Sequence, residues 1–320
     1  LKLLLILLLF SVLPSTAFAW GGRVHMDINR AAARNVPDDM AAWRAYADLL
    51  GRDGIWPDVW KGGDETEGPR HYLDAERYRP LAITNLPQDH SKVLALVGND
   101  DARNGLLPWV ILDVENKLTQ AMASNDWVSA TRYAAALGHY VGDGHQPLHL
   151  TEHYDGSPGP DGKGIHMRWE ERMPFFYWKA EMIKPKRAQY LDDPWNAVLR
   201  QLAQANDRFR DIYKADYEAT RLADEDVESA EYYRAMWKRT GDLFVEQVSA
   251  SVADLSSLWY TAWVNAGKPA IPKPPKHVSQ QTIWQDAAKP KSEMGRYVWP
   301  VAAALAAVAA LAVFLLRRSR

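Results

Sequence analysis

Hydrophobic residues between Trp20 and about Asn265 recur at intervals of three and four positions, and the alternation typical of β-strands is scarce. Asp, Ser and Thr residues that can cap a helix stand near several of the expected starts. The pattern therefore predicts an all-α, multi-helix domain over residues 20–267. Its clearest expected helices are Leu106 to Met122, Trp127 to Val141, Pro194 to Tyr213 and Val227 to Trp263.

The first residues have the pattern of a secretory signal peptide. Lys2 precedes an apolar run over residues 3–13, and Ala17-Phe18-Ala19 has the A-x-A form of a cleavage site. The run is too short for a good membrane span. Residues 1–19 are thus predicted to be a signal peptide, whose removal makes Trp20 the first residue of an exported protein. An N-terminal anchor that is never cut is the alternative.

The last residues have the pattern of a membrane tether. Residues 298–316 form an uninterrupted apolar stretch that is long enough to cross a bilayer, and the Arg-rich residues 317–320 belong on its cytoplasmic side. Residues 268–297 are rich in Pro and Lys, which suits an extended linker with no core of its own. We therefore expect a domain on the periplasmic or extracellular face, anchored by a C-terminal transmembrane helix. A buried hairpin helix is the alternative for the apolar stretch.

Composition restricts the chemistry. The 320 residues are 47% hydrophobic and 24% charged, which is ordinary for globular proteins. A net charge of -2 argues against a protein that coats duplex nucleic acid, so any nucleic-acid contact must be local. Because the chain contains no Cys, metal ligands must be His, carboxylate or backbone groups. Nothing in the sequence indicates an obligate protein partner.

The segment from His139 to His149 is the strongest candidate for a site. If the helix that begins near Trp127 continues through Asp143, His139 and Asp143 lie on one face, one turn apart. Gly144 and Pro147 then end the helix and return His149 to the same region. His139 and Asp143 alone could simply satisfy each other on an amphipathic helix.

Four other segments supply the same kinds of side chain, which favours a metal site over that simpler interpretation. His166 and Glu170 are again four residues apart and face one way if they are helical. Imidazole nitrogen and carboxylate oxygen are the ligands that zinc accepts where thiolate is absent. The candidate residues of these segments are His25, Asp58, His71, His166 and Glu170.

Together with Trp20, these residues and the His139/Asp143/His149 triplet resemble a known superfamily. It contains the bacterial zinc-dependent phospholipases C and the single-strand-specific zinc nucleases of fungi and plants. The resemblance covers Trp20 to about Glu171 through motifs, and continues to about Asn265 through the helical pattern only.

The resemblance implies three zinc ions held by nine residues. One ion would bind Asp58, His71, His139 and a shared Asp143. A second would bind the α-amino nitrogen and carbonyl oxygen of Trp20, His25 and the same Asp143. A third would bind His149, His166 and Glu170. A carboxylate that bridges two cations holds them close enough to activate one water molecule at neutral pH.

Two branches of the superfamily remain open, and the nuclease branch is favoured. The spacing of Trp20 and His25 resembles the nucleases, as does the run after His71, in which Tyr72 would stack on a base and Asp74 would bond its edge. Lys61 matches the position of a phosphate-binding Arg, and it keeps the charge but loses the bidentate geometry. Asp58 and Lys61 are accordingly the predicted catalytic residues. The expected substrate is single-stranded RNA or DNA, or nucleotides.

Two alternatives stand beside the nuclease interpretation. The spacing His166-x3-Glu170 resembles the phospholipases C, and a membrane tether would bring their lipid substrate close. A non-catalytic, zinc-stabilised helical module for protein interaction is the other alternative. Three ions with an open bridged pair exceed what a structural zinc site needs, which argues against that module.

Overall fold

The computed structural model describes residues 20–98, 101–156 and 162–284. These residues form an all-helical domain, and their one pairing of extended backbone is an isolated antiparallel bridge between Leu73 and Gly105. The predicted signal peptide, the apolar stretch 298–316 and the basic tail 317–320 lie outside the described residues. Within the described part, no helix combines the length and the apolar character that crossing a bilayer requires.

The helices range from single turns to one of 36 residues. The α-helices are α1 Gly22–Asn35, α2 Ala47–Asp53, α3 Trp56–Trp60, α4 His90–Val97, α5 Asp101–Asn104, α6 Leu107–Ala123, α7 Trp127–Gly144, α8 Ile165–Met167, α9 Met173–Tyr177, α10 Pro194–Asn206, α11 Phe209–Leu222 and α12 Ala230–Asn265. The 3-10 turns are η1 Asp38–Tyr46, η2 Gly68–His71, η3 Ala75–Tyr78, η4 Ile83–Asn85, η5 Pro147–Leu150 and η7 Ala180–Met182, and η6 Arg168–Arg172 is a π turn.

Three of the four clearest expected helices lie close to the positions that the hydrophobic pattern predicted, as α6, α7 and α12. The Asp126 side chain accepts a hydrogen bond from the Ser129 amide at the start of α7, as N-cap residues do. The fourth expected helix is divided into α10 and α11. The division follows Asn206, whose side chain donates to the Leu150 carbonyl at 2.6 Å. A contact with such a distant segment leaves no trace in the local periodicity.

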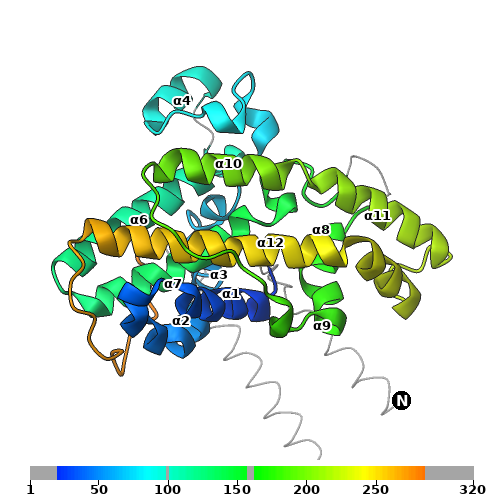
Figure 1. Ribbon diagram of the computed structural model, residues 1–320. Helices are drawn as coiled ribbons and strands as arrows, with labels where there is room; N and C mark the ends of the chain where they lie inside the picture. The colour runs from blue at the N-terminus through cyan, green and yellow to red at the C-terminus, as the bar shows by residue number, and fades with distance from the viewer. Residues whose placement is uncertain (1–19, 99–100, 157–161, 285–320) are drawn as a thin grey trace, which may run out of the picture.

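The long helix α12 organises the molecule. It crosses the middle of the view in Figure 1, with α10 on one side and α1 and α2 on the other, and it packs against α1, α6, α7 and α11. Large aromatic side chains fill the space around it, and Trp43, Trp169 and Trp259 are fully buried. Helix α7 packs against α1, α6 and α12, and every residue from Ala134 to Gly144 is buried. The second half of α7 therefore points its polar side chains into the protein interior.

The C-terminal strap, defined here as residues 268–284, packs along the helical domain (Figure 1, orange). It falls within the predicted linker and contains no helix. Its backbone carbonyls accept hydrogen bonds from the domain, at Gln280 from Trp60 Nε1 at 2.8 Å and at Gln281 from Arg132 at 2.8 Å. Ile283 is buried in the core. Pro residues exclude a helix here, but they allow an extended chain whose carbonyls reach the domain, so the packed unit runs to Trp284, past the expected boundary at residue 267.

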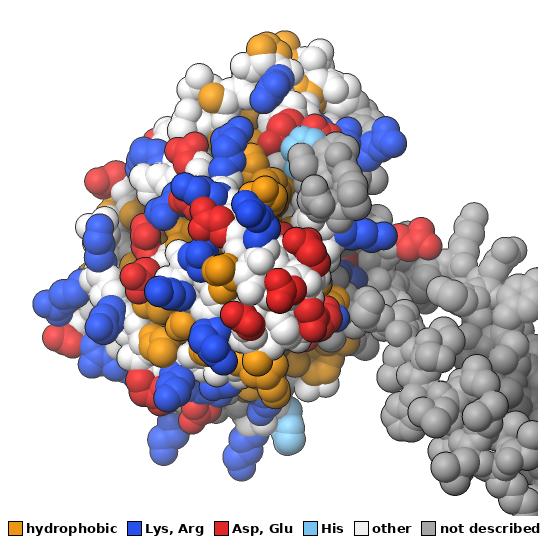
Figure 2. All heavy atoms as spheres, turned by 90° about the vertical axis from the view of Figure 1, so that its right-hand side faces the viewer, with side chains coloured by type: hydrophobic (Ala, Val, Ile, Leu, Met, Phe, Trp, Pro, Cys, Tyr) orange, Lys and Arg blue, Asp and Glu red, His pale blue; other side chains and the backbone are white. Residues whose placement is uncertain are grey.

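The surface carries both signs of charge in close mixture. Figure 2 shows the side of the molecule that lies at the right of Figure 1, where Lys and Arg side chains alternate with Asp and Glu side chains and neither sign prevails. This face agrees with the small net charge of the sequence. A polyanion therefore finds no broad basic surface on this side, and its binding would depend on individual pockets.

Candidate metal centre

Helix α7 supplies the centre of a buried cluster of His and carboxylate side chains. It continues through Asp143 as expected, so His139 and Asp143 face the same way, with His139 Nε2 3.4 Å from Asp143 Oδ2. Both side chains are fully buried. The His25 ring of α1 stacks on the His139 ring at 3.9 Å, and His25 Nε2 lies 3.4 Å from Asp143 Oδ1.

Glycine residues on α7 allow this close approach of α1. A Cβ atom at Gly142 would lie 2.9 Å from His25 Nδ1, and one at Gly138 would lie 2.1 Å from Asn29 Oδ1. Both distances are below the contact that real Cβ atoms make. The two glycines are therefore required for α1 to present His25 to the His139 and Asp143 side chains.

The connections around α3 and η2 bring two further predicted residues to the same cluster. His71 Nδ1 lies 2.9 Å from Asp143 Oδ2 and 3.7 Å from Asp58 Oδ1. Asp58 Oδ1 is also 3.5 Å from His139 Nε2. Two groups of three potential metal ligands result, and within each group the ligand atoms lie within 4.8 Å of one another. These groups are His25, Asp58 and His139, and His71, His139 and Asp143.

A third group of potential ligands lies beside the first two. His149 on η5, His166 on α8 and Glu170 on the π turn η6 bring their ligand atoms within 4.8 Å of one another. His166 Nε2 is 3.0 Å and His149 Nε2 is 3.5 Å from Glu170 Oε2. His149 Nδ1 is 3.7 Å from Asp143 Oδ1, so this group adjoins the Asp143 cluster. A π turn widens the helix locally and is frequent at functional sites.

Hydrogen bonds orient the His rings toward the cluster. His139 Nδ1 lies 2.8 Å from the Gly54 carbonyl, and His149 Nδ1 lies 2.8 Å from the His71 carbonyl. Since a carbonyl only accepts, each Nδ1 carries a proton, and in the neutral ring Nε2 then has a lone pair for a metal. His71 Nε2 faces Glu67 Oε1 at 3.3 Å, which leaves His71 Nδ1 for the cluster. Such partners are typical of His residues that bind metals.

The carboxylates of the cluster are held in their charged forms. Burial alone would raise the pKa of Asp143, but His139, His25 and His71 together hold it well below its ordinary value. Burial likewise opposes ionisation of Glu170, yet His166 and His149 lower its pKa to about 2. The Lys61 ammonium lies 2.6 Å from Asp58 Oδ1 and helps His139 to keep the pKa of Asp58 low. Buried negative charge accumulates here, as a cation site requires.

Unsatisfied buried atoms show that this cluster fits a metal. Unpaired polar atoms are costly inside a protein, and most native structures satisfy them. Among the described residues, the atoms without a hydrogen-bond partner include both His25 nitrogens, Asp143 Oδ1, His149 Nε2, His166 Nε2 and Glu170 Oε1. These are nitrogen and oxygen donors of the kind that zinc accepts, and they lie in groups of three.

Trp20 lies at the junction of these groups and is fully buried. Its indole Nε1 donates to the Gly142 carbonyl at 2.5 Å, and its ring packs against Trp169 at 5.2 Å. The next residue, Gly21, donates its backbone amide to the Glu170 carbonyl at 3.1 Å. The backbone at Trp20 is thereby held between the end of α7 and the π turn, on which Asp143 and Glu170 lie.

Comparison with known proteins identifies the family. Residues 20–274 match the model of a family described as S1/P1 nuclease. The chain belongs to the S1/P1 nuclease family. Membership indicates a zinc-dependent phosphodiesterase and favours the nuclease branch of the superfamily, and zinc is the metal expected for the buried cluster.

A curated relative carries a different description. It is a protein from Bradyrhizobium tropiciagri described as a probable serine protease, and it is 26% identical to this chain. The similarity covers 66% of this chain and 33% of the relative, so the chain spans about a third of that protein's length. Its description therefore applies to a much longer protein.

In this S1/P1 nuclease family member, a pocket of about 430 Å³ opens onto the His and carboxylate cluster. His71, His149 and His166 line it, and so do the predicted catalytic residue Lys61 and the predicted substrate-binding residues Tyr72 and Asp74. Burial raises the pKa of Asp74 to about 7, although Arg77 opposes the shift. The predicted substrate-binding residues and three His residues of the cluster therefore share one cavity.

Residues that sequence reasoning did not identify also contribute to this region. Arg77, Arg103 and Tyr154 line the same pocket, and the Tyr154 ring meets the His166 ring edge-on at 5.4 Å. Glu67 is fully buried behind His71. Its position four residues before His71 on adjoining turns was an available signal, because residues at that spacing lie on one side of a helical segment.

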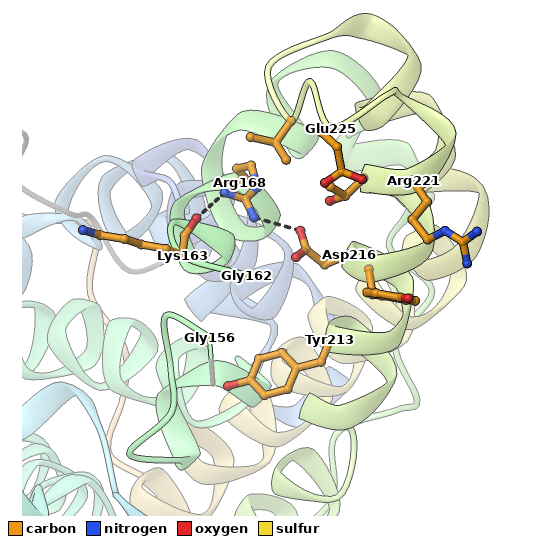
Figure 3. A pocket seen from close by; sticks show the side chains of 11 residues that line it. Gly156, Gly162, Lys163, Arg168, Tyr213, Asp216, Arg221 and Glu225 are labelled. Atoms are coloured by element: carbon orange, nitrogen blue, oxygen red, sulfur yellow. Dashed lines mark hydrogen bonds and ion pairs between the residues drawn. The ribbon is translucent and has the colours of Figure 1, made fainter. Parts of the chain in front are cut away.

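The π turn is fixed from behind by a buried ionic network. Figure 3 shows the pocket of about 410 Å³ into which Arg168 and Asp216 project, with Arg168 bonded to the Lys163 carbonyl and to Asp216. Arg168 donates to Asp216 Oδ1 at 2.9 Å and to the Tyr232 hydroxyl at 2.9 Å. Arg168 stands between His166 and Glu170 in the sequence. The network thus ties the segment that carries these two residues, α8 and the π turn, to α11 and α12.

Proposed function

We propose that this protein is a zinc-dependent phosphodiesterase that cleaves single-stranded RNA or DNA, with 3'-nucleotidase activity on the same site. The observation that carries the proposal is the single cavity that is lined both by His71, His149 and His166 of the buried cluster and by Lys61, Tyr72 and Asp74. Membership of the S1/P1 nuclease family supports the same reaction class.

Three zinc ions would engage all eight residues of the three groups of potential ligands, together with Trp20. Asp58, His71, His139 and Asp143 would hold the first ion, and His149, His166 and Glu170 would hold the third. The second would take His25, Asp143 and the α-amino nitrogen and carbonyl oxygen of Trp20. When bound, zinc lowers the pKa of water and neutralises charge that develops on a phosphate group. Asp143 lies between His25 and His71, so its two oxygens can serve two ions.

The remaining residues of the cavity would position the substrate. Lys61 Nζ lies beside Asp58, where it can bind a phosphate oxygen. Tyr72 would stack on a base, and the Asp74 carboxyl would bond the edge of that base. A base can enter this cavity only after it leaves a duplex stack, which favours single-stranded substrates.

The proposed location is outside the cytoplasm. The predicted signal peptide supports export, and cleavage after Ala19 would free the Trp20 amine as a ligand. Tethering by residues 298–316 rests on the sequence pattern.

A comparison of substrates tests the proposal. Zinc-loaded protein is offered single-stranded DNA, RNA, duplex DNA, a nucleoside 3'-monophosphate and phosphatidylcholine vesicles at equal phosphate concentration. We expect rapid cleavage of the single strands, slower cleavage of the duplex and release of phosphate from the nucleotide. Preferential hydrolysis of phosphatidylcholine would identify a phospholipase C instead, and zinc binding without turnover of any ester would identify a non-catalytic module.

A further inference from the structure

Trp284 connects the C-terminal strap to the region behind the metal centre. It lies beyond residue 274, where the match to the family ends. Its indole Nε1 donates to the Tyr140 hydroxyl at 3.3 Å. Its ring is covered by the Arg70 guanidinium at 4.3 Å and by the Lys117 ammonium at 4.3 Å from the centroid. One side chain of the strap thus contacts three polar side chains of the domain.

Two of these contacts converge on the same buried carboxylate. The Tyr140 hydroxyl donates to Glu67 Oε1 at 2.5 Å, and Arg70 donates to Glu67 Oε2 at 2.7 Å. Trp284 therefore touches the donor to each oxygen of Glu67. Glu67 is fully buried, so its orientation depends on these donors and on His71.

Glu67 in turn orients a predicted metal ligand. Its Oε1 lies 3.3 Å from His71 Nε2, and the opposite ring nitrogen, Nδ1, faces Asp143 at 2.9 Å. A carboxylate that bonds the His nitrogen facing away from the metal keeps the proton on that nitrogen. It thereby makes the other ring nitrogen a stronger metal ligand. Rotation of Glu67 would therefore disturb both the ring angle and the proton position of His71.

We propose that Trp284 is a positioning residue for the metal centre, which it supports through Tyr140, Arg70 and Glu67 to His71. The strap then has a role in the metal site although it lies outside the part of the chain that matches the family. This inference rests on the proposed zinc centre. It concerns how tightly one ion is held and is independent of which phosphodiester is cleaved.

Zinc affinity is the direct test, measured by chelator competition on the full-length protein. Loss of a partner behind a metal ligand typically weakens metal binding by about 10 to 100-fold, so we expect a loss near the lower end of that range in Tyr140→Phe, which acts on His71 through Glu67. Trp284→Phe keeps a ring over Arg70 but loses the Nε1 donor, so a loss of about 3 to 10-fold is expected for the same ion. Because both changes act on one path, the double variant should bind zinc no more weakly than Tyr140→Phe alone.

Trp263→Phe is the matched control. Trp263 also bonds the strap through Nε1, to the Pro269 carbonyl at 2.9 Å, and it also lies beside a cation, Lys268. This control should lose comparable thermal stability and keep its zinc affinity within about twofold, since within the described part of the chain no hydrogen bond or ring contact leads from Trp263 to Glu67. The absorption spectrum of the Co²⁺-loaded proteins gives a second readout, in which Trp284→Phe and Tyr140→Phe should shift the bands and Trp263→Phe should not.

Several results would overturn the inference. Unchanged zinc affinity in Trp284→Phe together with weaker binding in Tyr140→Phe would show that Tyr140 supports the metal centre without Trp284. An equal loss in Trp263→Phe would assign the effect to general stability, and additive losses in the double variant would show independent actions. A wild-type protein that takes up no zinc would refute the proposed function as well, whereas zinc uptake with an unaffected Trp284→Phe would refute this inference alone.

Discussion

Tyr72 lines the cavity but does not belong to the groups of potential metal ligands. Its substitution can therefore test base recognition separately from the reaction at phosphorus. We expect Tyr72→Ala to weaken oligonucleotide binding by roughly 1 to 3 kcal/mol, the usual contribution of one base stack. Zinc content should be unchanged, and so should hydrolysis of an aryl phosphodiester that has no base. The measurement is KM and kcat for both substrates. Equal losses on both would show that Tyr72 supports the metal centre instead.

Glu115 offers a second test at the level of one side chain, away from the metal centre. It is 4% exposed on α6, and burial raises its pKa to about 7, against a small opposing effect of Thr119. Between about pH 4.5, the ordinary pKa of a Glu side chain, and pH 7, the Glu115 carboxyl therefore keeps its proton in the folded protein and loses it in the unfolded chain. This contribution to stability is present below pH 4.5 and is lost as the pH rises through 7.

Glu115→Gln should remove that dependence. Compared with wild type, we expect the variant to be more stable at pH 8 by about 3 kcal/mol and equally stable near pH 4.5, because Gln cannot ionise. Urea denaturation at both pH values measures the difference. An equal gain at both pH values would point to better packing and would contradict the pKa assignment.

At the scale of elements, the contact between α1 and α7 is the most sensitive part of the centre. In Gly142→Ala the new Cβ would lie 2.9 Å from His25 Nδ1, so α1 must move and His25 leaves its position over His139. Overpacking of this kind costs about 1 to 3 kcal/mol, although Ala favours a helix more than Gly does. We expect lower stability in urea and weaker zinc binding.

Gly63→Ala is the control for this substitution. Its Cβ would approach no atom more closely than 3.9 Å, at the Trp60 carbonyl, so neither quantity should change by more than a small amount. If Gly142→Ala behaves like this control, α1 can tolerate the extra methyl group and the close approach is not needed for the site.

The sequence was informative about elements and less so about their partners. The three- and four-residue spacing of hydrophobic residues predicted the all-helical fold. It also predicted the helix α7, on which His139 and Asp143 lie. Each predicted His and carboxylate residue lies in a short segment with its own local signal, so it could be identified from the sequence. The structure brings these residues into three groups. The strap residue Trp284 had no such signal, since its contact with Tyr140 joins residues far apart in the chain, and Glu67 had only its spacing of four residues from His71.

For the whole molecule, the proposed ligand at Trp20 links activity to processing of the chain. Residues added before Trp20 turn its α-amine into an amide, which is a poor ligand. We therefore expect an N-terminally extended protein to bind one zinc ion fewer and to lose most of its turnover. Metal content by mass spectrometry, compared with a protein that carries the same extension at its C-terminus, checks this. Equal zinc content in the two proteins would exclude the N-terminal ligand.

The cluster around Asp143 joins four separate stretches of the chain, residues 20–25, 58–71, 139–149 and 166–170. In a chain without Cys, metal ions at this cluster would act as cross-links that close long loops, and such links stabilise a protein chiefly by restricting the unfolded chain. A chelator should then lower the midpoint of thermal unfolding by roughly 10 °C, with recovery on addition of Zn²⁺. An exported chain of this kind would reach full rigidity only in the compartment where it meets zinc, so the metal supply there would set how long each molecule survives proteolysis.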